Sequence, residues 1–399
     1  MLHDSVQWIL LLCVAALALA YVVFPVLMVV LGVWDEKRRP AADSEAVSMP
    51  TTSLIIPAYN EQAVIESKLE NSLALEYPEG QLEIVVACDG VSDNTAKLAQ
   101  RYASDRVKVF DFPIRRGKAA VINDAIERST GDVICLCDAN VMFATDALKR
   151  LVARLSEPGV GAVSGDVRLD SARSSFGVAE RIYYWMERGI HRGESATSSM
   201  IGVDGGMYVI RRVLYFPIRN DTILDDFTIS MNVIRHGKRI QYAPEAVANE
   251  NATEAASTEF RRRIRLSAGA AQLLLRGITP TIAQPLALLY FVSHKFLRWT
   301  SPFIIIIGLA ASIVLAKDEL IYRLVIAVGA AFVVLAILGC VSLRLRRIAL
   351  FAVPFFFTLG QIAIAYGICK GIFTPNDPRW PRTERPSTFD GRNKGESLG

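Results

Sequence analysis

The sequence predicts an α/β domain held between transmembrane helices, one on its N-terminal side and about three on its C-terminal side. Two features of the composition predict this arrangement. Of the 399 residues, 52% are hydrophobic and 21% are charged. The mean hydropathy of +0.30 is high for a soluble enzyme, whereas the charged fraction is high for a bundle of membrane helices alone. The charges are concentrated in the middle of the chain, which therefore has the composition of a globular domain.

Four stretches without charged residues are long enough to cross a membrane, because roughly 20 apolar residues span the bilayer core. They cover residues 6–34, 299–316, 324–343 and 348–369. A cleaved signal peptide is the alternative for the first stretch. Its leading residues, MLHDSVQ, contain no Lys or Arg, and its apolar run is longer than a signal peptide needs. We therefore expect an N-terminal anchor.

Basic residues next to these stretches predict the orientation in the membrane. They occur in DEKRRP at 35–40 and in RLRR at 344–347. The positive-inside rule places both segments on the cytoplasmic side. We expect a multi-pass protein of the cell inner (plasma) membrane whose globular domain is cytoplasmic.

Six segments follow from these boundaries. Residues 282–298 combine apolar bulk with basic residues, which is typical of a helix lying at the membrane surface. In chain order, we expect a transmembrane helix at 1–34, a cytoplasmic linker at 35–50, a cytoplasmic domain at 51–279, an interfacial amphipathic helix at 280–299, transmembrane helices at 300–371 and a partly disordered tail at 372–399.

Within the domain, β-rich runs alternate with helix-like stretches, which is typical of a parallel α/β sheet. The expected strands are 51–58, 82–88, 107–112 and 132–137. The expected helices are 62–75, 92–102 with Ser92 as its cap, 118–127 and 145–155.

Polar side chains follow each expected strand, at the edge where ligands bind in such sheets. Glu61 and Asp89 can accept hydrogen bonds from a base or ribose, and Lys118 can bind phosphate. Asp138 and Asn140 offer the oxygen ligands that Mg²⁺ or Mn²⁺ prefers. Polar strand ends occur in any α/β protein, but four complementary ends favour a nucleotide diphosphate site.

Six motifs in order resemble those of membrane-bound family 2 glycosyltransferases, in the branch of the cellulose, hyaluronan, chitin and poly-N-acetylglucosamine synthases. They are IIPAYNE (55–61), CDGVSDNT (88–95), RRGKAAVIND (115–124), CDANVMF (137–143), GVDGGMYVIRR (202–212) and LDDFTIS (224–230). The resemblance covers the whole domain and extends to the transmembrane plan. It implies a GT-A, Rossmann-like mixed sheet and an inverting transferase that uses a nucleotide sugar, commonly a UDP-sugar, with Mg²⁺ or Mn²⁺.

The resemblance also implies roles for particular residues. Asp89 matches the uridine-contacting aspartate, and Asp138 with Asn140 matches the metal-binding Asp-x-Asp, where the second carboxylate is here an amide. The Gly-rich centre of GVDGG resembles part of the acceptor pocket, although a tight turn before a strand explains it equally well.

Asp225 and Asp226 stand where a helix is expected to begin, so helix capping is one explanation for them. The chemistry needs a carboxylate that takes a proton from the attacking hydroxyl. Two adjacent carboxylates should raise at least one apparent pKa of the pair. In the resembling family the second residue of a Glu-Asp pair is the base, which implies that Asp226 is the base and that Asp225 replaces the glutamate.

Arginines downstream occupy the positions of the family's arginine-rich motif, in which they clamp the diphosphate. They are Arg262, Arg263 and Arg265. Plain membrane-surface binding is the alternative. Leu266 replaces a tryptophan that stacks on the acceptor in processive members, so processive elongation is open, and Trp185 or Trp299 are other candidates for stacking.

We therefore expect a UDP-sugar-dependent hexosyltransferase that moves a sugar, with N-acetylglucosamine as the first candidate, onto a growing glycan or lipid-linked acceptor in extracellular polysaccharide synthesis. The expected partners are the nucleotide-sugar donor, the acceptor, membrane lipids and other polysaccharide-synthesis or export subunits, with no nucleic acid. Two alternatives remain: a non-processive transferase that adds one sugar to a membrane lipid, and a catalytically inactive nucleotide-binding membrane module.

Overall fold

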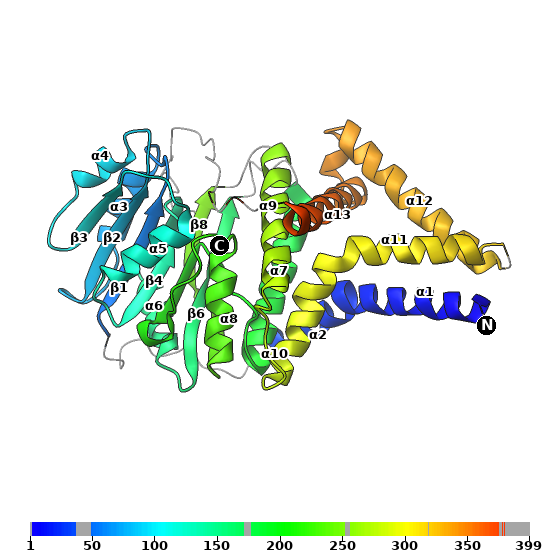
Figure 1. Cartoon of the computed structure of the whole chain (residues 1–399), viewed down its shortest axis with the longest axis horizontal. Coiled ribbons are helices and arrows are strands. Elements are labelled where there is room, and N and C mark those ends of the chain that lie inside the picture. Colours follow the sequence, from blue (N-terminus) through cyan, green and yellow to red (C-terminus); the bar gives the residue numbers. More distant parts are fainter. Residues whose placement is uncertain are drawn as a thin grey trace, which may run out of the picture.

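The computed structural model describes residues 2–36, 49–170, 177–251, 256–317, 319–374, 377 and 379. An α/β domain forms one end of the molecule, and long apolar helices project from its other side (Figure 1). The domain is built on one eight-stranded sheet with the order β3-β2-β1-β4-β7-β6-β8-β5. The strands are β1 Thr52–Ala58, β2 Leu82–Asp89, β3 Val107–Phe112, β4 Val133–Cys137, β5 Val141–Phe143, β6 Val160–Asp170, β7 Met207–Arg211 and β8 Arg239–Asn251.

Strands β1 to β4 pair in parallel, and their carboxyl ends therefore lie along one edge of the sheet. Strand β7 pairs antiparallel with both β4 and β6, which makes the sheet mixed. The mixed α/β sheet confirms the predicted fold class. The domain helices are α3 Ile65–Leu73, α4 Thr95–Gln100, α5 Lys118–Glu127, α6 Ala147–Leu155, α7 Gly177–Thr197, α8 Asp225–Arg235 and α9 Ala256–Leu275.

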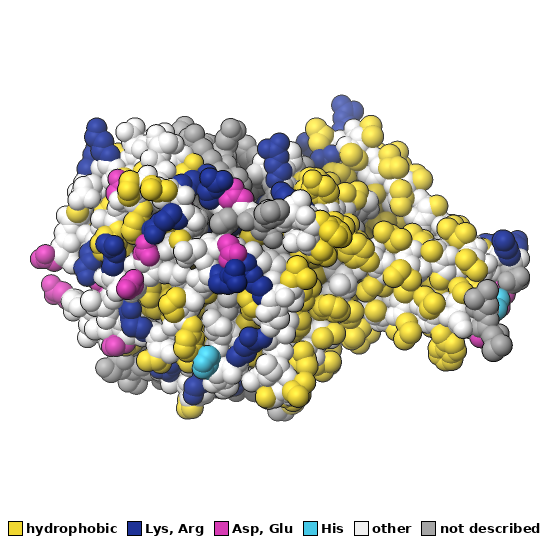
Figure 2. All heavy atoms as spheres, viewed as in Figure 1, with side chains coloured by type: hydrophobic (Ala, Val, Ile, Leu, Met, Phe, Trp, Pro, Cys, Tyr) yellow, Lys and Arg dark blue, Asp and Glu magenta, His cyan; other side chains and the backbone are white. Residues whose placement is uncertain are grey.

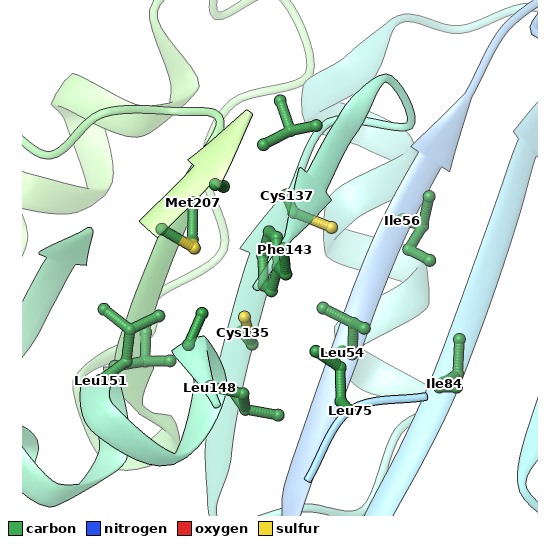
Figure 3. Packing of buried hydrophobic residues seen from close by; sticks show 14 of the residues in the cluster. Leu54, Ile56, Leu75, Ile84, Cys135, Cys137, Phe143, Leu148, Leu151 and Met207 are labelled. Atoms are coloured by element: carbon green, nitrogen blue, oxygen red, sulfur yellow. The ribbon is translucent and has the colours of Figure 1, made fainter. Parts of the chain in front are cut away.

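Alternate residues of the central strands face two separate cores, as the two-residue period of a strand requires. Leu54 and Ile56 of β1 pack with Leu148 and Leu151 of α6 on one face (Figure 3). Ile55, between them, belongs to the core on the other face. That second core also includes residues of α5, α8 and the apolar helices that flank the domain, so these helices share one apolar interior with the domain.

Three helices begin later than the sequence predicts: α3 at Ile65, α4 at Thr95 and α6 at Ala147. Helix α4 starts at Thr95, not at Ser92. The hydroxyl of Ser92 accepts a hydrogen bond from Asn60 Nδ2, and the Ser92 N–H donates to Asn60 Oδ1. Ser92 thus ties the ends of β1 and β2 together and does not cap the helix. Helix α5 has the predicted bounds, Lys118–Glu127.

Four helical runs flank the domain, one before it and three after it, as predicted. They cover His3–Asp35, Pro285–Leu315, Leu320–Val341 and Ala349–Phe373, and each is long and apolar enough to cross a membrane. Apolar side chains cover the projecting helices, whereas Lys, Arg, Asp and Glu gather on the domain (Figure 2). The elements are α1 Leu2–Ala18, α2 Phe24–Glu36, α10 Pro285–Tyr290, α11 Leu297–Leu315, α12 Leu320–Val341 and α13 Ala349–Phe373.

The second of these runs includes the segment for which we expected a separate interfacial helix. A π-helical turn, Phe291–Phe296, joins α10 to α11 without a break. Another π-helical turn, Leu19–Val23, joins α1 to α2. Single π-helical turns inside α-helices are rare. In the turn Leu19–Val23, the carbonyl of Ala20 accepts a hydrogen bond from Arg298 Nε of α11.

Helix α2 is fixed to the domain by close packing against α7, a helix that the sequence analysis did not anticipate. A Cβ on Gly189 would lie 2.5 Å from Val29 Cγ2, and one on Gly32 would lie 2.8 Å from Arg192 Cβ. A Cβ on Gly193 would overlap the backbone of Met28. Only glycine therefore permits this approach of the two helices.

We predict that Gly193→Ala lowers the stability of the protein, because overpacking against a rigid backbone costs about 1–3 kcal/mol. The expected fall in the midpoint of thermal unfolding in detergent is roughly 2–6 °C. Gly329→Ala in α12 is the matched control, since its Cβ would lie 3.8 Å from the nearest atom, Leu309 Cδ2. Equal midpoints for the two variants would contradict the close packing of α2 on α7.

Candidate active site

The end of β2 organises the loop that leads into α5. The Asp89 side chain is fully buried, and its carboxylate accepts hydrogen bonds from the backbone N–H groups of Arg116, at 2.7 Å, and Gly117, at 2.9 Å. Gly117 has φ of 100°, a conformation that favours glycine. These contacts place Lys118 as the first residue of α5. Asp89 thus fixes this loop, in addition to the nucleoside contact expected of it.

The end of β1 lies beside this loop. The guanidinium of Arg115 stacks on the Tyr59 ring, 3.6 Å from its centroid. The backbone N–H of Glu61 donates to Thr95 Oγ1 at 2.7 Å, and the Glu61 carbonyl accepts from the first residues of α3. Glu61 and Asp89 therefore stand at the ends of neighbouring strands, on the edge where ligands bind in such sheets.

Lys118 joins carboxylates from two distant parts of the chain. Its Nζ lies 2.8 Å from Asp138 Oδ1, at the end of β4, and 3.5 Å from Asp225 Oδ2, at the start of α8. Burial disfavours the ammonium form, but Asp138 and Asp225 outweigh that effect and hold the pKa of Lys118 above its ordinary value. The two acidic motifs predicted from sequence therefore meet at one cation.

The loop after β4 is held rigidly because α3 binds the strand that follows it. Lys68, which is fully buried, donates from Nζ to the carbonyl of Val141 at 2.6 Å and lies over the Phe143 ring. Asn71 donates to the Phe143 carbonyl and accepts from the Phe143 N–H. The short strand β5 is thereby fixed, and with it the loop from Asp138 to Asn140.

The metal-binding residues expected in this loop differ in their surroundings. Asp138 is partly exposed and pairs with Lys118. Asn140 is buried and donates from Nδ2 to Glu250 Oε1 at 2.8 Å. In the described part of the chain, His, Cys, Asp and Glu side chains form no group of three or more that could hold a metal. The donor set fits an ion that takes few ligands from protein, as Mg²⁺ does when phosphates and water supply the rest.

Asp226 lies in the first turn of α8, next to the Lys118 bridge. Its Oδ1 accepts the Phe227 N–H at 2.7 Å. Burial, together with the neighbouring Asp225, raises the pKa of Asp226 to about 7. A Cβ on Gly205 would lie 2.8 Å from Asp226 Oδ2, so the GVDGG turn passes directly against this carboxylate. The segment is a tight turn before β7 and also a wall of the acidic site.

Residues 53–215 match the glycosyl transferase family 2 domain. The chain therefore carries a glycosyltransferase family 2 domain. The chain is 26% identical over 266 residues to the poly-β-1,6-N-acetyl-D-glucosamine synthase of Staphylococcus epidermidis, and 27% identical over 265 residues to that of Staphylococcus aureus strain COL. These matches cover 65% and 64% of this chain, and they span 64% of the length of each relative.

The fold of the family 2 domain and its flanking helices is also found in a solved structure. A mannosyltransferase from Pyrobaculum calidifontis, in complex with GDP-Man and Mn²⁺, superimposes with a TM-score of 0.70 at 23% identity. The similarity covers 92% of this chain and 99% of that chain. The arrangement of sheet and apolar helices is therefore common to both proteins.

The arginines of α9, just beyond the matched domain, take three different positions. Arg265 lies near Asp225, Asp226 and Asp138, and burial lowers its pKa. Its Nε is buried without a hydrogen-bond partner among the described residues. Arg262 is 3.5 Å from Glu259. Arg263, 2.7 Å from Glu259, stacks on Phe356 of α13 and so faces the membrane helices. Of these three arginines, Arg265 is the one that joins Lys118 beside Asp138, Asp225 and Asp226.

The candidate stacking residues differ in exposure. Leu266 is partly exposed, and Trp185 is exposed on α7. Trp299 packs edge-on against Phe227 and Phe291, with ring centroids 5.6 and 5.8 Å away. Trp299 thus supports the residue that follows Asp226.

Two carboxylates near the site were not singled out from the sequence. Burial raises the pKa of Asp204, in the GVDGG turn, to about 6, and Glu250 and Asp138 add to this shift. The motif around Asp204 was visible in the sequence. Glu250 ends a long strand in an ordinary polar segment, so nothing in its spacing indicated a role.

We predict that Asp89→Ala destabilises the domain by about 2–3 kcal/mol, because it leaves two buried backbone N–H groups without an acceptor. Chemical unfolding in detergent measures the loss. Asp105→Asn, at an exposed position, is a control that should change stability by less than about 0.5 kcal/mol. If Asp89→Ala matched this control, Asp89 would not hold the loop before Lys118.

Proposed function

We propose that the protein is an inverting glycosyltransferase that moves a sugar from a UDP-sugar onto a growing glycan or a lipid-linked acceptor at the membrane, in extracellular polysaccharide synthesis. The observation that carries this proposal is the Lys118 bridge. It joins Asp138, within the residues 53–215 that match the family 2 domain, to Asp225 beside Asp226, which follow that match. Asp138, proposed to bind the metal of the donor, and Asp226, proposed as the base, thus belong to one site.

In this mechanism Asp226 takes the proton of the acceptor hydroxyl as its oxygen attacks the anomeric carbon. The bond to the diphosphate breaks on the opposite side, so the configuration inverts. Asp225 and the buried surroundings keep the pKa of Asp226 near 7, where a carboxylate is a useful base. Gly205 and the turn around it define the wall beside which the acceptor binds.

The leaving nucleoside diphosphate is held by cations of the protein. Lys118 and Arg265, whose Nε has no described partner, lie beside Asp138 and Asp225, and Arg262 of α9 lies near Asp204 and Glu250. Mg²⁺ or Mn²⁺, held by Asp138 and the Asn140 carbonyl oxygen, would neutralise negative charge on the diphosphate. Glu61 and Asp89 face the nucleoside end of this edge. The contacts of Arg263 favour a structural role between α9 and α13.

N-acetylglucosamine is the first donor sugar to test, because the curated relatives at 26–27% identity are named as poly-β-1,6-N-acetyl-D-glucosamine synthases. Nucleotide release from purified protein, measured with UDP-N-acetylglucosamine, other UDP-sugars and GDP-mannose in the presence of Mn²⁺, tests the donor class. Release from GDP-mannose alone would contradict a UDP-sugar donor. No release from any donor would favour the inactive nucleotide-binding module.

A single-addition transferase is the second candidate, and Leu266 favours it. The position that carries a stacking tryptophan in processive relatives has an aliphatic side chain, and Trp299 is engaged with Phe227 and Phe291. Electrophoresis or mass spectrometry of labelled products separates the two candidates. A ladder of lengths indicates polymerisation, whereas one addition product indicates single transfer.

We predict that Asp226→Asn lowers kcat by about 10²–10⁴-fold, because an amide cannot accept the proton. Binding of UDP should remain within about threefold, since Asp226 lies on the acceptor side of the bridge. Asp105→Asn serves as the matched carboxylate-to-amide control. Transfer by Asp226→Asn at a near-native rate would exclude Asp226 as the base.

The raised pKa of Asp226 predicts a pH dependence of kcat/KM. The carboxylate must be ionised to act, so activity should be lost as the pH falls through about 7. Asp225→Asn removes a neighbouring negative charge, which makes ionisation of Asp226 easier and shifts this limb to lower pH. A limb that stays in place in Asp225→Asn would show that the titrating group is not Asp226.

A further inference from the structure

Asn140 occupies the second position of the Asp-x-Asp pattern, where an amide brings less negative charge to a metal than a carboxylate. The amide is buried and points its Nδ2 at Glu250 Oε1, 2.8 Å away. The Glu250 carboxylate therefore lies directly beside Asn140, the residue that replaces the second aspartate of the pattern.

The backbone holds Glu250 in this place. Strand β5 pairs antiparallel with β8, and Val141, which follows Asn140, is opposite Glu250. Helix α3 fixes β5 from behind through Lys68 and Asn71. Glu250 thus projects from a paired strand, and Asn140 is the last residue of the loop that leads directly into the anchored strand β5.

Glu250 is also held near Asp138, because Asn140, whose Nδ2 lies 2.8 Å from Glu250 Oε1, is two residues from Asp138 in the loop between β4 and β5. Both carboxylates lie close enough to Asp204 to raise the pKa of its carboxyl group, and Arg262 opposes them. Asp138 pairs with Lys118 at 2.8 Å, and Glu250 interacts electrostatically with Arg262 of α9. The two carboxylates therefore lie beside different cations of the protein, Lys118 and Arg262.

We propose that Glu250 supplies the second carboxylate of the divalent-cation site, with Asn140 orienting it through the Nδ2 hydrogen bond. This inference rests on the proposed function, because it assumes that a nucleoside diphosphate and a divalent cation bind at Asp138. Asp138 and Glu250, with the Asn140 carbonyl oxygen and the diphosphate, form a hard-oxygen donor set of the kind that Mg²⁺ and Mn²⁺ prefer. Glu250 of β8 thus supplies the negative charge that Asn140 does not carry.

The test measures Mn²⁺ binding without turnover. Electron paramagnetic resonance titration of free Mn²⁺, with UDP present and with the full-length protein in detergent, gives the affinity of each variant. Glu250→Gln should weaken Mn²⁺ binding by about 10–100-fold. Glu245→Gln, on the same strand but paired with Arg154, is the matched control and should bind Mn²⁺ like the wild type.

A charge exchange separates ligation from folding. The double variant Asn140→Asp/Glu250→Gln moves the carboxylate to the other side of the same hydrogen bond, and it should recover Mn²⁺ affinity to within about threefold of the wild type. Binding of UDP without metal, measured in parallel, reports on the integrity of each variant.

Three results would overturn the proposal. Wild-type Mn²⁺ affinity in Glu250→Gln would show that Glu250 does not contribute, while leaving the proposed function intact. A double variant as weak as Glu250→Gln would show that the loss came from disturbed packing. A wild-type protein that binds UDP but no Mn²⁺ would remove both this proposal and the metal from the proposed function.

Discussion

The site depends on the ion pairs that the Lys118 ammonium group makes with two carboxylates. The ammonium group lies between a carboxylate at the end of a central strand and a carboxylate at the start of α8. Without a cation, Asp138, Asp225 and Asp226 would repel one another in a partly buried space, where water screens charge poorly. Asp89 fixes Lys118 through the backbone of the preceding loop. Asp89, which is fully buried, therefore controls the position of Lys118, and Lys118 brings Asp138 and Asp225 together.

Much of this arrangement could be predicted from sequence. The first four strands and α5 follow from the alternation of apolar runs and polar turns. Asp89 and Asp138 stand at the ends of strands, and Asp226 stands at the start of a helix. The start of α4 was predicted wrongly because Ser92 bonds to Asn60, a contact between strand ends that local patterns do not reveal. Glu250 was missed for a similar reason. Its partner Asn140 lies 110 residues away, and only the pairing of β5 with β8 brings them together.

Helix α9 connects the site to the membrane helices. Along one side, Gly367 and Gly371 of α13 pack against its backbone, where any larger side chain would overlap Ile264 or Ala268. On another side, Gln272 donates to the carbonyl of Asp221 and accepts from the N–H of Ile223, in the segment that leads into Asp225 and Asp226. The helix that carries Arg265 is thus bound both to α13 and to the segment before Asp225 and Asp226, which couples these parts of the structure.

The site carries features that cost folding free energy. The Arg265 Nε is buried with no described partner, and burial holds the carboxyl groups of Asp226 and Asp204 at raised pKa values. Each of these groups disfavours the folded state until a counter-charge or a hydrogen-bond partner arrives. A nucleoside diphosphate with a divalent cation would supply both, since phosphate oxygens accept from the arginine and the cation offsets the carboxylates. Part of the free energy of donor binding would then come from removing these unfavourable terms. The surrounding sheet, held by α3 and by two apolar cores, keeps the charged groups in place.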